Sequence, residues 1–245
     1  AGVPPSTMVR LAKAAGFESY DGFRHVFQQA VRSAGTDLVT RAEWLQRLPE
    51  GGRAAQVLGG MAGAILANIE QAFRGNELAA LKEAADTMRK ARRVHAVGVG
   101  GMHALAAYLH YVARMALPDV RLAEPAMASM IDELTDVEPA DVVVLLSVEP
   151  YASETVRVAE FVVRRKAPLV AITDSRASPI APLASTLLLA PTATPQFFPS
   201  QAAVIALIET LIALVVSHGD KHVLERIERA DRHRRESGMY WPRKR

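Results

Sequence analysis

From Arg93 onward, short runs of aliphatic residues alternate with longer segments whose apolar residues recur every three or four positions. Continuous Val, Ile and Leu runs are typical of parallel strands buried on both faces, whereas the longer spacing is typical of amphipathic helices. The predicted strands are residues 94–99, 120–122, 142–146, 169–173 and 186–189, and the predicted helices are residues 102–116, 127–134, 153–166 and 200–217. The alternation therefore predicts an α/β domain over residues 91–220, with a five-stranded parallel sheet between two layers of helices.

The first 90 residues show only helical spacing. One helix is expected from Pro5, which suits the first helical position, to Gly16, which suits the stop, and a second runs from about Ser19 to Ser33. Residues 34–52 are mixed and end in a turn signal, and two alanine-rich amphipathic helices follow at about 53–74 and 76–91. We expect a small helical domain over 1–35, interdomain helices over 36–90, and a basic helix with a tail over 221–245. Two short helices bury little area, so the first domain is expected to begin upstream of this chain.

Composition narrows the class of protein. Half of the 245 residues are apolar and none is cysteine, which excludes disulfides, thiolate metal sites and cysteine nucleophiles. The longest apolar stretch, 202–216, contains Glu209 and is too short to cross a bilayer. We expect a cytoplasmic protein with no membrane partner. Residues 221–245 hold nine Lys and Arg against four Asp and Glu, so a polyanion is expected to meet an end of the chain, although a solvated basic tail explains the charge equally well.

Ligands of parallel sheets bind beyond the carboxyl ends of the strands. That rule selects residues 98–103, Glu124, 147–155 and 174–178. The sequence VGVGGMHALA (97–106) is a glycine-rich strand-to-helix turn, but His103 stands where a dinucleotide fingerprint has its third glycine. We expect no cofactor, and a tight turn without a ligand remains an alternative for this stretch.

No catalytic or metal site stands out. His218 and His222 lie one helical turn apart, with Glu225 as the nearby third ligand, but histidines on a helix surface are the simpler interpretation, and we expect no metal. No set of Ser, His and Asp suggests a triad, so we expect no catalytic residues and no enzyme.

Hydroxyl and basic side chains follow the first predicted helix. Ser6 and Thr7 stand at its start and Arg10 and Lys13 further along, which is the arrangement that a major-groove recognition helix needs. Any capped surface helix has the same pattern. The residues alone therefore leave DNA binding open.

Three segments together carry a family resemblance. They are VPPSTMVRLAKAAGFESYDGFRHVFQQAV (3–31), the helices leading into RKARRVHAVGVGG (89–101), and ADVVVLLSVEPYASETVRVAEFVVRRKAPLVAITDSRASPIAPLASTLLLAP (140–191). In this order they resemble the RpiR/MurR family of bacterial transcription regulators, over nearly the whole chain. Members join a helix-turn-helix domain to a sugar isomerase (SIS) domain that binds a phosphosugar. The resemblance therefore implies that residues 1–35 are the C-terminal part of a helix-turn-helix DNA-binding domain and that residues 91–220 are an SIS domain.

The resemblance implies an effector pocket at the positions that the sheet already selects. We assign to it Gly100, Gly101, Met102, His103, Glu124, Ser147, Glu149, Tyr151, Ser153, Thr155 and Ser200. The family tends to carry a small hydroxyl residue where Met102 stands. It also ends its third strand in Ser-x-Ser-Gly-x-Thr, of which only Ser147 remains, because Glu149, Pro150 and Ala152 replace the later positions.

These departures disfavour a phosphate. Pro150 removes a backbone donor, and at about 4 Å and an effective dielectric constant of about 20 a carboxylate repels another unit charge by roughly 4 kcal/mol. Three interpretations stay open. Glu149 takes the place of the phosphate, or it binds hydroxyls or an amine of a different ligand, or it points to solvent and phosphate still binds. In the second case the apolar side of the pocket would be lined by Met102, Met127, Tyr151, Phe197 and Phe198. The second is slightly favoured.

The leading hypothesis is a DNA-binding transcriptional regulator, homodimeric or homotetrameric, that binds a double-stranded operator and senses a small-molecule effector through its SIS domain. The alternative is a sugar-phosphate isomerase or sugar-phosphate-binding protein. That alternative needs a competent phosphate loop and a positioned base, and the sequence shows neither.

Overall fold

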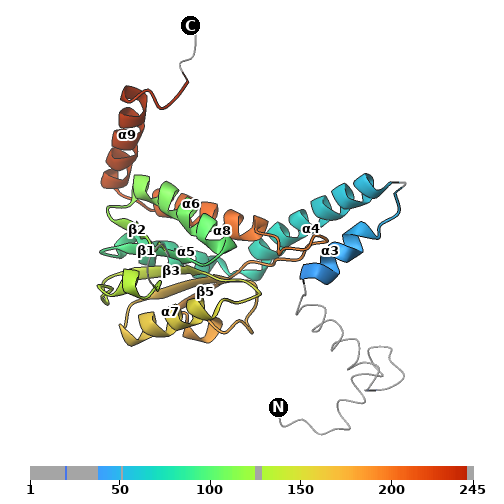
Figure 1. Ribbon diagram of the computed structural model, residues 1–245. Coiled ribbons are helices and arrows are strands. Elements are labelled where there is room, and N and C mark those ends of the chain that lie inside the picture. Colours follow the sequence, from blue (N-terminus) through green and yellow to red (C-terminus); the bar gives the residue numbers. More distant parts are fainter. Residues whose placement is uncertain (1–19, 21–37, 51, 125–128, 242–245) are drawn as a thin grey trace. The chain divides into compact units, whose positions relative to one another are not determined.

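A five-stranded, all-parallel sheet organises the larger part of the chain (Figure 1). The computed structural model describes residues 20, 38–50, 52–124 and 129–241, and the chain divides into two units, residues 1–48 and 49–245. The strands are β1 (Val94–Gly98), β2 (Val120–Leu122), β3 (Val142–Leu146), β4 (Leu169–Thr173) and β5 (Thr186–Leu189), in the spatial order β2-β1-β3-β4-β5. The order reverses between β1 and β3, which are paired from Val94 opposite Val142 to Gly98 opposite Leu146.

Helices cover both faces of this sheet. The α-helices of the described residues are α3 (Leu38–Gln46), α4 (Arg53–Gly75), α5 (Leu78–Lys90), α6 (Gly101–Ala116), α7 (Ser153–Arg164), α8 (Ala202–Ser217) and α9 (Lys221–Glu236). Two 3₁₀ turns, η1 (Asp132–Leu134) and η2 (Ala181–Leu183), complete the domain. Helices α5, α6 and α8 pack on one face, whereas α7 and the two turns pack on the other.

Alternate residues of each strand pack into hydrophobic cores on opposite faces of the sheet, because successive side chains of a strand point to opposite faces. In β3, Val142, Val144 and Leu146 face α6 and α8, whereas Val143 and Leu145 face α7. All five residues of β1, β3 and β4 are buried, which explains why their sequences are continuous aliphatic runs. The predicted α/β class and the five-stranded parallel sheet are confirmed.

Two local predictions were wrong. Residues 38–46, expected to be mixed, form helix α3, and the helix expected over 127–134 is only the short turn η1 where the chain is described. The side chains of Ser129 and Asp132 form a capping box: Ser129 Oγ accepts from Ile131 N, and Asp132 Oδ2 accepts from Ser129 N, so the helical turn begins only after Ser129. Ser6, Thr7, Arg10 and Lys13, and the predicted helices that carry them, lie outside the described residues. The proposed domain boundaries stay predictions.

No single helix among the described residues is long and apolar enough to cross a membrane. Only α8 and α9 taken together, with a bend of 118° between them, pass on length and composition.

Candidate functional site

The turn from β1 to α6 requires glycine at two positions. A Cβ atom on Gly98 would lie 2.4 Å from the backbone oxygen of Met102, which no side chain tolerates. Gly100 has φ +60° and ψ −129°, a backbone conformation that L side chains rarely adopt. The ring of Phe198 lies about 3.4 Å from where a Cβ atom on Gly101 would stand. The glycine turn is therefore approached by an aromatic ring that comes from the segment before α8.

Two hydroxyl groups at the turn from β3 into α7 form hydrogen bonds within the protein. Ser147 Oγ lies 3.0 Å from Thr155 Oγ1, and both side chains are buried. Thr155 Oγ1 also donates to the backbone oxygen of Ala152 at 2.7 Å, so its single proton is used there and the proton between the hydroxyls comes from Ser147. The predicted effector residues Ser147 and Thr155 thus lie together. In this arrangement they hold the loop closed at its base, while Ser153 is exposed in the first turn of α7.

Tyr151 links this loop to the end of β4. Its hydroxyl donates to Asp174 Oδ1 at 2.8 Å, and Asp174 Oδ1 also lies 3.3 Å from Thr173 Oγ1. Burial raises the pKa of Tyr151 well above the ordinary tyrosine value, and the Asp174 carboxylate and the nearby charge of Glu149 raise it further. Asp174 stood within the segment selected from the sequence but was not among the assigned residues. Its position directly after a buried strand was the signal that should have selected it.

The two glutamates of the loop have different surroundings. Glu154 Oε1 accepts from the backbone N–H of Met130 at 2.8 Å and so ties α7 to the segment before η1. Glu149 is half-buried, follows β3, and forms no hydrogen bond or ion pair within the described residues. The Glu149–Pro150 peptide bond is cis. Glu149 is the carboxylate of this loop that remains available to a ligand.

The other assigned residues fall into separate environments. Met102 is only 5% exposed and packs in the core shared by α6 and α8. Its assignment to the effector pocket stays a prediction. Ser200 is buried, His103 is half-buried with an unpartnered Nδ1, and Glu124 is exposed just beyond β2.

His218, directly after α8, and His222, in α9, have different partners. His218 Nδ1 lies 3.0 Å from the backbone oxygen of Leu214, and His222 Nδ1 lies 3.1 Å from Glu225 Oε2. Across the described part of the chain, no three His, Asp or Glu side chains are grouped so that they would hold a metal ion.

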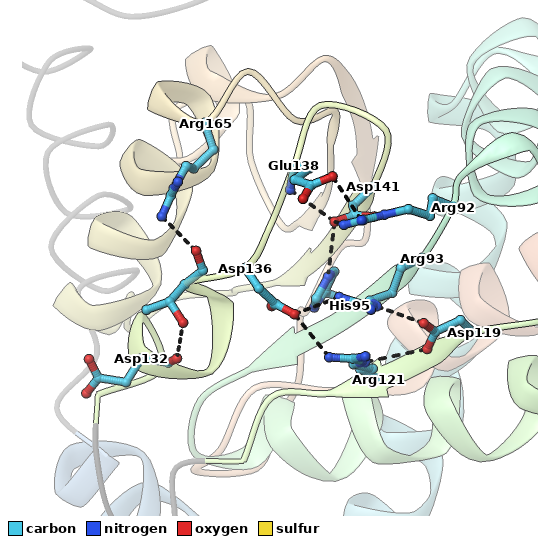
Figure 2. A network of polar contacts seen from close by, with 11 residues as sticks. Arg92, Arg93, His95, Asp119, Arg121, Asp132, Asp136, Glu138, Asp141 and Arg165 are labelled. Carbon is cyan, nitrogen blue, oxygen red and sulfur yellow. Dashed lines mark hydrogen bonds and ion pairs between the residues drawn. The ribbon is translucent and has the colours of Figure 1, made fainter.

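A dense polar network lies at the opposite, amino edge of the sheet (Figure 2). Arg92, just before β1, donates two hydrogen bonds of 2.8 Å to Asp141, just before β3. The carboxylate of Asp141 is fully buried, and burial favours the neutral acid. The hydrogen bonds from Arg92 and from the backbone N–H of Glu138, together with the charge of Arg92, outweigh burial and lower the pKa of Asp141. Arg93 bridges Asp119 and Asp136, both at 2.8 Å, and Arg121 approaches the same two carboxylates.

This network satisfies its own charges, and it joins the starts of three strands rather than leaving groups for a ligand. His95 lies beneath it, with Nε2 3.8 Å from Asp141 Oδ2 and without a hydrogen bond. Burial lowers the pKa of His95, so the imidazole is neutral at neutral pH. We assign the network a structural role.

The glycine turn after β1 and the hydroxyl-bearing loop after β3 lie on either side of the switch point of a parallel sheet. This arrangement is typical of α/β domains that hold a small ligand at the carboxyl edge of the sheet. Residues 87–217, more than half of the chain, match the SIS domain family. The protein belongs to this family.

Solved structures share the fold. The sugar isomerase domain of the RpiR transcription factor from Sphaerobacter thermophilus is 24% identical and superposes with a TM-score of 0.67, covering 72% of this chain and 99% of that one. The NanR protein of Vibrio vulnificus, solved with ManNAc-6P, is 16% identical with a TM-score of 0.62, covering 95% of this chain and 81% of that one. Phosphoheptose isomerase from Neisseria gonorrhoeae is 15% identical with a TM-score of 0.52, covering 62% and 93%. No curated protein matches the chain.

Proposed function

We propose that this protein is a transcriptional regulator of the RpiR type, which binds double-stranded DNA through its N-terminal segment and a small metabolite through its SIS domain. The observation that carries the proposal is the combination of an SIS domain with an upstream sequence that resembles a helix-turn-helix domain. The similarity to NanR, which covers 95% of this chain and so extends beyond the SIS domain, supports the same combination.

An enzymatic role has less support. Isomerisation of a sugar needs a base placed beside the substrate and a loop that holds the substrate still. In the loop after β3 the hydroxyls of Ser147 and Thr155 bond to each other, and Glu154 is engaged with the backbone of Met130. We therefore propose a sensor and not a catalyst.

The effector is proposed to differ from a phosphosugar. The rim of the site carries carboxylates after three strands: Glu124 after β2, Glu149 after β3 and Asp174 after β4. A phosphate would approach these charges with the hydroxyl groups of Ser147 and Thr155 already engaged, at a cost in free energy that a few neutral hydrogen bonds do not offset. A ligand with hydroxyl or amino groups, which donates hydrogen bonds to carboxylates, suits this rim better.

Self-association is proposed to occur along α4. Of its 23 residues only Asn68 and Ala72 are buried, whereas Leu58 is 73% and Leu66 is 68% exposed. A long apolar helix face of this kind is stabilised when a second copy covers it, and a two-fold dimer suits paired half-sites on DNA.

DNA binding is tested by selecting sequences from a random duplex library with the complete chain and then measuring affinity by fluorescence anisotropy. Replacing Arg10 by Ala is expected to weaken binding to the selected duplex at least about tenfold. Arg157→Ala, which removes the same charge from the exposed face of α7, is the matched control and leaves affinity unchanged. Failure to enrich any sequence, together with turnover of a phosphosugar in a coupled assay, would establish the isomerase instead.

The effector is tested by thermal shift with matched pairs, beginning with N-acetylmannosamine 6-phosphate against N-acetylmannosamine and extending to sugar acids and amino sugars. A ligand at 100 times its Kd adds about 2.7 kcal/mol of apparent stability, which is readily measured. We expect stabilisation only by unphosphorylated compounds. Stabilisation by the phosphorylated member of a pair would refute a changed effector.

A further inference from the structure

Helix α9 and the end of α6 enclose a hollow of about 620 Å³ that the SIS site does not include. The two helices are in contact, and α6 has by this point returned from the carboxyl edge of the sheet to the amino edge, where Leu117 and Pro118 lead into β2 (Figure 1). The hollow is therefore a separate site at the far end of the domain.

Its lining is strongly basic. Arg226, Arg229, His233 and Arg234 project into it from α9, and Arg114 projects from the last turn of α6. Spacings of three and four residues place Arg226, Arg229 and His233 on one face of the helix, and Arg234 follows at the edge of that face. The acidic residues of α9, Glu225, Glu228, Asp231 and Glu236, do not line the hollow.

The four guanidinium groups lack acidic partners. Within the described residues, none of Arg114, Arg226, Arg229 and Arg234 forms an ion pair, although Arg235 of the same helix pairs with Asp231 at 2.8 Å. Like charges that converge on one concavity repel each other, and low-dielectric walls focus their field. A multiply charged anion would remove this repulsion.

The chemistry of the lining points to phosphate groups. The planar guanidinium forms two parallel hydrogen bonds with a phosphate, and four of them suit two or more linked phosphates better than one. Apolar groups stand beside the charges: Tyr111, whose ring lies 5.1 Å from the Arg234 guanidinium carbon, together with Met115 and Met239. The volume is that of a small-molecule pocket, and a concave site of this size does not admit a DNA duplex.

We propose that this hollow is a second ligand site, which binds a small anion with two or more linked phosphate groups. The anion is either free polyphosphate or the polyphosphate chain of a nucleotide, whose base would lie against Tyr111 and the methionines. The site is distinct from the SIS site at the carboxyl edge.

The test is isothermal titration calorimetry on the complete chain at about 0.15 M salt, with tripolyphosphate, a nucleoside triphosphate and inorganic phosphate as separate probes. Saturable binding is expected for the first two, and tighter binding of the nucleotide would assign a role to the apolar wall. Arg226→Gln combined with Arg229→Gln is expected to weaken binding about tenfold or more, and Arg114→Gln, on the other helix, to weaken it independently.

The matched control is Arg232→Gln, which removes the same charge from an exposed position of α9 outside the hollow. It is expected to change the affinity less than twofold, and thermal melts check that every variant is folded. The absence of saturable binding would overturn the proposal, as would a loss of affinity in Arg232→Gln equal to that in the variants of the hollow. So would displacement of the anion by duplex DNA with the same dependence on Arg226 and Arg229, because the arginines would then belong to a DNA contact.

Discussion

The hydroxyl of Tyr151 lies 2.8 Å from Oδ1 of Asp174, and this hydrogen bond joins the loop after β3 to the loop after β4. The two loops form neighbouring parts of the carboxyl edge, because β3 and β4 are paired in the sheet. The hydrogen bond of Tyr151 thus restrains the loop between β3 and α7, in which Glu149 also lies. It ties this edge of the candidate site to the end of β4.

The ionisation of Tyr151 is the direct test of this contact. Burial and the Asp174 carboxylate raise its pKa, so Tyr151 is expected to remain protonated at a pH where exposed tyrosines have ionised. Tyrosinate absorbance between pH 8 and 12 should show the same ionising tyrosines in Tyr151→Phe as in the natural chain. Asp174→Asn should bring Tyr151 partly back toward the ordinary range, with burial accounting for the remainder. Loss of a tyrosine signal near pH 10 in Tyr151→Phe would contradict the contact.

Replacing Glu149 by Ser tests whether its carboxylate excludes phosphate. If Glu149 faces the ligand, the substitution removes a repulsion of roughly 4 kcal/mol and adds a hydroxyl donor. The affinity for N-acetylmannosamine 6-phosphate, measured by calorimetry, should rise at least about tenfold. Glu160→Ser, an exposed position further along α7, is the control and should leave affinity unchanged. Equal affinities in Glu149→Ser and the natural chain would mean that the side chain points to solvent.

Three glycine-to-alanine substitutions should change the free energy of unfolding in different directions. Gly98→Ala forces a Cβ atom to 2.4 Å from the Met102 backbone oxygen and is expected to destabilise the protein by about 2 kcal/mol or more. Gly101→Ala meets the Phe198 ring at 3.4 Å and should cost less. Gly63→Ala, within α4 and with open space around it, should raise stability by about 0.5–1 kcal/mol. Urea unfolding measures all three, and a neutral Gly98→Ala would refute the geometry of the turn.

Stability is expected to fall as the pH drops from about 7 toward 5. Burial lowers the pKa of His95 in the folded state, so below its ordinary value of 6.5 the unfolded chain binds the proton more readily. The contribution of neutral His95 to the free energy of unfolding is complete above that pH and is lost as the pH falls below it. His110, whose pKa burial also lowers, acts in the same direction, so His95→Gln should reduce the slope of Tm against pH without abolishing it. An unchanged slope in His95→Gln would refute the assignment.

Much of the fold was predictable from local pattern. The strands β2, β3, β4 and β5 begin and end at the predicted limits. For β3 and β4 the reason is that a strand buried on both faces has no polar positions to blur its limits. The helix expected over 127–134 is shorter for a local reason as well, since the side chains of Ser129 and Asp132 form a cap that starts the helical turn after Ser129.

The candidate site was predictable in place but not in detail. The strand ends select the loops after β1, β3 and β4, and these loops do form the carboxyl edge. Which hydroxyls meet each other was not in the pattern: Ser147 and Thr155 are eight residues apart, and their contact depends on how tightly the loop turns into α7. Met102 likewise lies beside two exposed glycines in the sequence but packs into the core.

By itself the sequence determined the α/β class, the strand limits and the edge at which a ligand would bind, since each follows from the period of burial along one segment. Only the tertiary structure decided that Tyr151 meets Asp174, that Phe198 lies over Gly101, and that five basic side chains of α6 and α9 line one hollow. These contacts join residues far apart in the chain, and their partners are set by how the elements pack and not by the period within any one of them.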